Sequence, residues 1–231
     1  MGDRAAFSGE EQMSATAEPD THEMVVIHRV FRREFGLLPE LISRVGPGDT
    51  GRAAIVGEHL SDIVAALHHH HENEDDLLWP PLLETAKLHT DLVHRMEFQH
   101  AALSTALDQI DKLTPAWRAT ANPADRDALA QAVRDASAIL DEHMAEEEQE
   151  ILPLVRKYLT VEQWSKLGER GAESIEDKHK RLLFLGAILE ETSPEEERNF
   201  LSSLPAPVRL IWKFAGRRQY GNYIRRVRGT R

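Results

Sequence analysis

The sequence of 231 residues contains no cysteine. Disulfide bonds, thiolate metal ligands and cysteine nucleophiles are therefore excluded, and any metal ion must be held by nitrogen and oxygen atoms. No apolar run approaches the roughly eighteen residues that a membrane-spanning helix needs, and residues 1–20 lack the apolar core of a secretion signal. No segment shows the period-two alternation of a half-buried strand. These absences predict an all-α, cytoplasmic protein without a membrane span.

Acidic residues outnumber basic ones, and the net charge is −11. The excess is unevenly placed: residues 205–231 carry a net charge of +8 and no acid, which leaves −19 on residues 1–204. Because the basic segment is also rich in aromatic and aliphatic residues, we expect it to pack on the acidic body. Anionic lipid and nucleic acid are the alternative partners. Since no nucleic-acid-binding motif is present, we expect no nucleic-acid partner.

Turn and capping signals divide the chain into three parts. Residues 1–20 are small and polar and are interpreted as a flexible leader. Residues 21–158 contain four stretches in which apolar side chains recur at spacings of three and four, as on the buried face of a helix. Residues 159–231 form a helical extension with the basic tail, and two capping boxes predict short helices near 161–171 and 194–203, with another at about 174–191.

Turn signals at Gly46–Asp49 and Pro80-Pro81 separate the long helices, and the second helix is expected to start near Asp49 or Thr50. Asn122-Pro123 is the start signal of the fourth, a cap residue followed by proline in the first helical position. Gly36 and Pro39 also predict a kink or break near Leu38 in the first helix. Four helices joined by short turns indicate an up-down-up-down antiparallel four-helix bundle.

Two of these helices carry the same polar pattern. The stretches Leu67–Pro80 and Leu140–Pro153 read LHHHHENEDDLLWP and LDEHMAEEEQEILP, and each contains Leu-x-x-His-x-x-x-Glu. On a helix this spacing places the leucine, the imidazole and the carboxylate on one face. The pairs are His70 with Glu74 and His143 with Glu147.

The other two helices each place a histidine on their apolar stripe, His28 and His100, with identical flanking spacings. Counting residues from the helix ends places all four histidines at one level of an antiparallel bundle. Burying imidazoles and carboxylates without partners is costly, so we expect two metal ions to satisfy them together. Imidazole with carboxylate suits iron, manganese or zinc. One carboxylate from each repeat would bridge the ions, and unfilled coordination would be open to water, dioxygen or peroxide.

The order His, His-x-x-x-Glu, His, His-x-x-x-Glu on four successive helices, followed by Leu-Trp-Pro and Ile-Leu-Pro, resembles the hemerythrin-like (HHE cation-binding) domain family. The resemblance covers about residues 21–158, and the extension is similar to that of actinobacterial members. It implies a non-heme di-iron centre with an oxo or hydroxo bridge, with zinc or manganese as alternatives. The positions that match the family's di-iron ligands are His28, His70, Glu74, His100, His143 and Glu147.

The sequence departs from the invertebrate hemerythrin pattern in two places. Met96 stands where that pattern has a further histidine, so one iron lacks an imidazole. We expect His71 to replace it, with Glu97 as the alternative. The pattern also has a longer spacing to the acid on the fourth helix, which selects Glu148, but Glu147 matches Glu74 in the repeat and is preferred.

The resemblance implies a protein that binds or reduces dioxygen, hydrogen peroxide or nitric oxide. Losing one histidine opens coordination and favours redox turnover over reversible oxygen carriage. The leading hypothesis is peroxide breakdown with catalase- or peroxidase-like activity and no catalytic residues beyond the metal ligands. The alternatives are a module that senses oxygen, nitric oxide or iron without turnover, and a structural bundle stapled by zinc.

Overall fold

The computed structural model describes residues 17–229, and all regular structure in that range is helical. Most of the predicted leader, residues 1–16, lies outside the described residues. The predicted all-α class is confirmed. Among the described helices none is both long enough and apolar enough to cross a bilayer.

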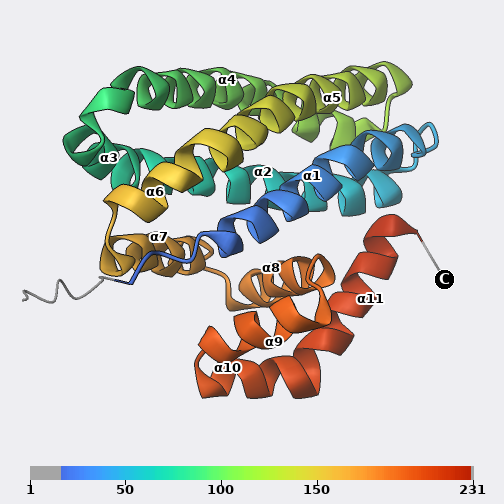
Figure 1. The fold of residues 1–231 in the computed structure, drawn as a ribbon. Helices are drawn as coiled ribbons and strands as arrows, with labels where there is room; N and C mark the ends of the chain where they lie inside the picture. The colour runs from blue at the N-terminus through green and yellow to red at the C-terminus, as the bar shows by residue number, and fades with distance from the viewer. Residues whose placement is uncertain (1–16, 230–231) are drawn as a thin grey trace, which may run out of the picture.

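Four long helices build the body of the molecule. They are α1 (His22–Ser43), α2 (Thr50–Leu77), α4 (Thr90–Thr120) and α5 (Pro123–Glu146). Successive helices run in opposite directions (Figure 1). Each packs on two others, α1 and α4 both lying against α2 and α5. The short helix α3 (Trp79–Thr85) and a 3₁₀ turn at Lys87–His89 connect α2 to α4.

Two of the predicted starts are capped as the sequence indicates. The backbone N–H of Arg52 donates to the Asp49 side chain over 2.9 Å at the start of α2. At the start of α5 the N–H of Ala124 donates to Asn122 over 2.7 Å, with Pro123 in the first helical position. Each cap satisfies a backbone group that the first helical turn leaves free, an effect of about 1 kcal/mol.

The apolar stripes meet in two main clusters, with the level of the histidines between them, and a small third cluster joins Met24 to Leu152 and Leu167. The larger one fills the bundle interior and includes Phe31, Phe35, Leu67 and Leu140. The smaller one closes the bundle end beyond the histidines and includes Leu78, Trp79, Met96 and Ile151. Each of these side chains is at most 1% exposed, and burying one contributes about 1.5–3 kcal/mol. The two clusters fix the helices on both sides of the polar level.

Of the kink or break expected near Leu38, the break does not occur. α1 continues through Gly36 and Pro39 to Ser43. Phe35 and Ile42, on either side of the proline, are fully buried in the main core. Their burial outweighs the backbone hydrogen bond that Pro39 cannot donate.

α6 (Leu152–Tyr158) ends the part of the chain expected to form the bundle. The elements after it are α7 (Val161–Ser174), α8 (Lys178–Glu190), α9 (Pro194–Ser203), α10 (Ala206–Ile211), a π-helical turn at Trp212–Gly216 and α11 (Arg217–Arg228). Both predicted capping boxes are present, Thr160 with Gln163 and Ser193 with Glu196. α7 packs on α2, α8 on α1, and α11 on α8 and α2.

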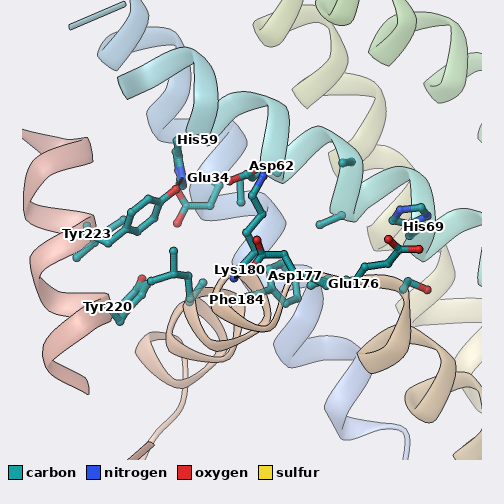
Figure 2. Close-up of a pocket in the computed structure, with 18 residues that line it drawn as sticks. Glu34, His59, Asp62, His69, Glu176, Asp177, Lys180, Phe184, Tyr220 and Tyr223 are labelled. Carbon is teal, nitrogen blue, oxygen red and sulfur yellow. Dashed lines mark hydrogen bonds and ion pairs between the residues drawn. The ribbon is translucent and has the colours of Figure 1, made fainter. Parts of the chain in front are cut away.

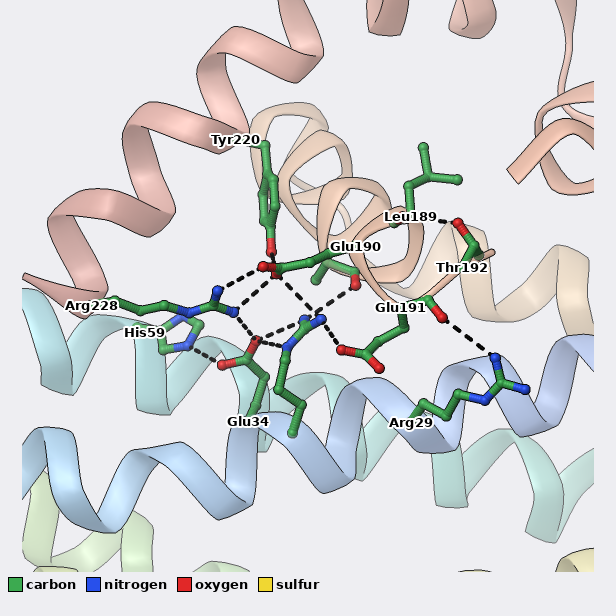
Figure 3. A network of polar contacts seen from close by, with 11 residues as sticks. Arg29, Glu34, His59, Leu189, Glu190, Glu191, Thr192, Tyr220 and Arg228 are labelled. Atoms are coloured by element: carbon green, nitrogen blue, oxygen red, sulfur yellow. Dashed lines mark hydrogen bonds and ion pairs between the residues drawn. The ribbon is translucent and has the colours of Figure 1, made fainter. Parts of the chain in front are cut away.

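A polar network attaches the extension to the first hairpin (Figure 3). Arg228 on α11 donates to both oxygens of Glu190 on α8, at 2.6 and 2.9 Å, and lies 3.6 Å from Glu34 on α1. Arg33 on α1 lies 2.8 Å from Glu34 and 2.5 Å from Glu191. Glu34 is only 1% exposed, so its carboxylate is charged and buried at the junction of α1 and the extension.

Glycine permits the close approach of α11 to α8. A Cβ atom on Gly186 would overlap the ring of Tyr220. The Tyr220 hydroxyl in turn donates to Glu190. α10, near the start of the basic tail, lies on the side of α8 away from the bundle, whereas α11 packs on α8 and α2 (Figure 1).

Candidate metal centre

The structure brings together all the residues that the sequence singles out. His28 lies on α1, His70 and Glu74 on α2, His100 on α4, and His143 on α5. Glu147 begins the π-helical turn that follows α5. His28, Glu74, His143 and Glu147 have no exposed surface and His100 is 5% exposed, whereas the His70 side chain keeps 14% of its surface exposed.

The imidazoles form two facing pairs. The Nε2 atoms of His28 and His70 lie 3.4 Å apart, and those of His100 and His143 lie 3.2 Å apart. Glu74 connects the pairs, with Oε1 3.3 Å from His70 Nε2 and Oε2 3.4 Å from His100 Nε2. Glu147 does the same, its Oε2 lying 3.3 Å from His28 Nε2 and 3.8 Å from His143 Nε2. Each carboxylate therefore reaches both pairs.

Three of the histidines are oriented by an acceptor on their second nitrogen. His28 Nδ1 donates to Glu148 over 2.8 Å, and His100 Nδ1 donates to Asp75 over 2.6 Å. His143 Nδ1 donates to the Gln99 side-chain oxygen over 2.9 Å. Because each Nδ1 donates, a neutral ring presents the lone pair of Nε2 to the centre of the site. The equivalent roles of Asp75 and Glu148 follow from their equivalent places in the repeat.

The two carboxylate acceptors are themselves held in place. Asp75 also accepts a hydrogen bond of 2.8 Å from Trp79 Nε1, and Glu148 accepts one of 2.7 Å from Arg32. These partners and the imidazoles lower the pKa values of both carboxyl groups against the effect of burial, so both stay ionised. An ionised acceptor fixes the ring orientation and strengthens the imidazole as a ligand.

The chemistry of the donor set fits bound cations. Two facing Nε2 lone pairs repel each other, so a cation, either a proton or a metal ion, has to lie between the nitrogens of each pair. Within the described chain, both oxygens of Glu74 and of Glu147 lack hydrogen bonds of good geometry, as does His71 Nε2. Leaving buried carboxylates uncompensated costs several kcal/mol each. Metal ions bound to these atoms would satisfy all of them at once.

The structure also bears on the replacement of the missing histidine. His71 is 6% exposed, and its ring stacks on His100 with centroids 4.3 Å apart. It forms a group with Glu74, His100 and His143 in which one potential ligand atom of each lies within 4.8 Å of the others. Glu97 instead accepts from His94 over 2.7 Å at the surface. The arrangement favours His71.

A local widening of the helix positions the acid that follows α5. Residues 147–151 form a π-helical turn, which inserts one extra residue into the helix. Glu147 thereby points into the site while Ile151 is fully buried in the end cluster. Glu148 keeps a quarter of its side chain exposed and takes the outer position on His28. The geometry favours Glu147 over Glu148 as the inner acid.

Burial and neighbouring charges set the protonation of the imidazoles. Burial lowers the pKa of His70 to about 3 and that of His143 to about 4, so both rings are neutral at pH 7. At His28 burial also acts to lower the pKa, but Glu147 and Glu148 outweigh it and raise the pKa to about 9. A metal ion that binds His28 must therefore displace a proton, and metal binding releases protons to solvent.

A separate cavity of about 330 Å³ lies between α2, α8 and α11 (Figure 2). At one end His59 contacts Glu34 through Nε2 at 3.0 Å and the Tyr223 hydroxyl through Nδ1 at 2.9 Å. His59 thus stays outside the metal cluster, as its distance along the helix predicts. Glu34 and Tyr223 carry no local signal in the sequence, because His59, their shared partner, lies 25 and 164 positions from them in the chain.

An all-helical bundle with imidazoles and carboxylates converging in its core defines a metal-binding class of helical protein. The chain belongs to the hemerythrin family: the model of the hemerythrin HHE cation binding domain matches residues 20–155. The family resemblance found in the sequence is thereby confirmed. Comparison with the curated proteins and with the solved structures gives no match.

Replacing an outer acceptor should weaken metal binding without removing a ligand. We expect Asp75→Ala to lower metal affinity about 10- to 100-fold, because His100 loses the group that orients it. Competition with a chromogenic chelator measures the effect. The control is Asp76→Ala, which removes the next carboxylate, 57% exposed and paired with Arg170 at the surface. Equal affinity in the two variants would contradict the role given to Asp75.

Proposed function

We propose that the protein is a non-heme di-iron protein that reacts with hydrogen peroxide or dioxygen, and that its activity is the breakdown of peroxide. The observation that carries the proposal is the pair of facing imidazole pairs joined by two buried carboxylates. His28, His70 and Glu74 form one group of potential ligands, and His71, Glu74, His100 and His143 form another. Glu147 lies between the groups as a second bridging acid.

Bound iron would relay two electrons from one peroxide molecule, which is oxidised to dioxygen, to a second, which is reduced to water. The protein residues do the rest. The carboxylates of Glu74 and Glu147 balance the charge of the ions in a site from which bulk water is excluded. Asp75, Glu148 and Gln99 hold three of the rings in one orientation. Met96, fully buried, offers no imidazole at the position where the invertebrate hemerythrin pattern has a further histidine, and His71 is the proposed replacement ligand.

Entry of a small oxidant is easiest at His70. Its side chain is 14% exposed, whereas those of His28, Glu74, His143 and Glu147 have no exposed surface. Phe31 packs beside the His70 ring, with centroids 5.3 Å apart, so the approach is narrow and partly apolar. Such an entrance suits a small uncharged molecule such as hydrogen peroxide or dioxygen.

The second candidate is a sensor of oxygen, nitric oxide or iron that acts without turnover. It is favoured by the position of Phe31, which contacts His70 at the site and Phe184 on α8, with ring centroids 5.3 and 6.2 Å apart. Glu34, which holds the extension, lies on the same helix as His28. A change in ligation or oxidation state at the site could therefore reach the extension through the contact of Phe31 with Phe184 and through α1.

The test combines metal content, visible spectrum and peroxide turnover. We expect wild type to hold two irons, one for each ligand group, with near-ultraviolet charge-transfer bands and many peroxide molecules consumed per iron. The Glu74→Ala/Glu147→Ala variant should lose iron, bands and turnover together. Glu72→Ala/Glu142→Ala, which removes two exposed acids from the same helices, is the matched control.

Each of the other outcomes would support a different function or a different location of the metal. Iron that binds ligand without turnover and alters the protease sensitivity of the extension would replace the enzyme by the sensor. One zinc ion with no visible absorption would indicate a structural staple. Iron content unchanged in the double variant would show that the metal binds elsewhere.

A further inference from the structure

Three large apolar side chains are exposed close together at the far edge of the extension. Leu210, Ile211 and Phe214 are 56, 54 and 77% exposed and lie within five residues. The other exposed large apolar residues of the described chain come from separate elements, α1, the 3₁₀ turn, α4 and α7. α10 and the turn after it lie along the edge of the molecule farthest from α4 and α5 (Figure 1).

Unpaired basic side chains surround this apolar group. Residues 206–229 contain seven lysines and arginines and no acid. Arg217 pairs with Glu197 and Arg228 with Glu190, but within residues 17–229 Lys213, Arg218 and Arg226 have no acidic side chain within 4 Å. α9 begins with three acids nearby, of which Glu196 and Glu197 are already paired with arginines. The edge is therefore both apolar and basic.

The opposite face of the same helical segment holds it to the protein. Trp212 and Tyr220 are 5 and 8% exposed and pack in the main core cluster with Ile224. A Cβ atom on Gly216 would lie 3.1 Å from Leu182 on α8, so the segment is closely packed on that helix. The exposed apolar residues are thus presented by a fixed helix and not by a loose tail.

We propose that this surface, formed by Leu210, Ile211, Lys213, Phe214 and Arg218, docks the protein on an anionic lipid bilayer. Apolar side chains that alternate with basic ones are typical of helices that lie in the membrane interface. The basic groups are attracted to anionic headgroups, while the apolar groups enter the acyl boundary. The acidic body, with net charge −19 over residues 1–204, is repelled and is held away from the membrane.

Other occupants fit the surface less well. Pairing of the surface with the same surface of a second copy would bring Lys213 and Arg218 against their own counterparts. The acidic bundle of a second copy offers complementary charge, but its exposed apolar residues are scattered singly. Nucleic acid would match the arginines but leave three aliphatic and aromatic side chains without an apolar partner.

The test is sedimentation of the full-length metal-loaded protein with lipid vesicles. We expect binding to vesicles containing about one-third phosphatidylglycerol and little binding to pure phosphatidylcholine. Raising the salt from about 0.1 to 1 M, which shortens the screening length from about 10 to 3 Å, should weaken binding. Leu210→Ser/Phe214→Ser should reduce affinity at least about tenfold, because two buried apolar contacts are lost. Lys213→Glu/Arg218→Glu should do the same.

Two variants serve as matched controls. Phe98→Ser removes a phenylalanine that is 75% exposed on α4, close to the 77% of Phe214. Arg44→Glu reverses an exposed arginine on α1. Both should bind as wild type does, and circular dichroism should show all variants folded.

Three outcomes would overturn the proposal. One is equal binding to the two kinds of vesicle, and another is equal loss of binding in the Phe98→Ser control. The third is a wild-type dimer, measured by light scattering without lipid, that Leu210→Ser/Phe214→Ser abolishes. That result would make the surface an interface between copies.

Discussion

Removing the bound metal should lower the free energy of unfolding by about 4 kcal/mol for each ion, if each is normally present at about 1,000 times its dissociation constant. Two ions then contribute about 8 kcal/mol, and the melting temperature of a chain of this size should fall by at least about 15 °C. The reason lies in the core. Without cations, Glu74 and Glu147 are fully buried among imidazoles with no hydrogen bonds of good geometry.

Scanning calorimetry of the iron-loaded and chelator-treated protein measures this difference. In Glu74→Ala/Glu147→Ala the melting temperature should not depend on added iron, because the bridging acids are gone. Glu72→Ala/Glu142→Ala should keep the full dependence. A metal-free wild type that melts within about 2 °C of the loaded protein would show that the cluster is satisfied without cations.

Glu34→Gln should destabilise the protein by about 3 kcal/mol at pH 7. Burial alone would raise the pKa of Glu34, but His59 and Arg33 outweigh it and lower the pKa from 4.5 to about 2. A carboxyl group whose pKa is depressed on folding stabilises the folded state above its unfolded pKa. The contribution is therefore complete above about pH 4.5 and is lost as the pH falls toward 2. At pH 3 the difference between wild type and variant should be about 1.4 kcal/mol.

Urea unfolding followed by circular dichroism at pH 7 and pH 3 measures both differences. Glu40→Gln is the control, because Glu40 lies further along α1 with 63% of its side chain exposed and pairs only with Arg44. It should shift stability by less than about 0.5 kcal/mol at either pH. Equal shifts in the two variants, or a Glu34→Gln effect that does not shrink at pH 3, would contradict the account.

Much of the fold could be predicted because the capping residues and the periodic spacing of apolar side chains indicate the same helices. Asp49, Asn122 and the two capping boxes mark helix starts with side chains that can act only locally. The repeated spacing of His70 with Glu74 and of His143 with Glu147 places these side chains on one face whatever the neighbouring helices do. The convergence of the cluster then follows from the antiparallel order of the helices.

The remaining features depend on contacts that a single helix pattern does not contain. The π-helical turn at Glu147–Ile151 widens the helix between the site and the end cluster, and its residues read as ordinary helix. Pro39 is a breaking signal that tertiary packing overrides. Gln99, the acceptor for His143, has no equivalent acid in the repeat. Glu34 and Tyr223 both contact His59, and Tyr223 reaches it only because α11 packs back against α1 and α2.

The position of the π-helical turn in the chain also determines when the set of proposed ligands becomes complete during synthesis. It carries the last of the proposed ligands, Glu147, while His28 lies near the start of the domain. At about 5–20 residues per second, the roughly 120 residues between them take a ribosome about 6 to 24 s to add. Once Glu74 has been added, the first hairpin carries His28, His70, His71 and Glu74 without the closing acid while roughly 70 further residues are made. The full set of proposed ligands therefore exists only after the turn that follows α5 has been synthesised.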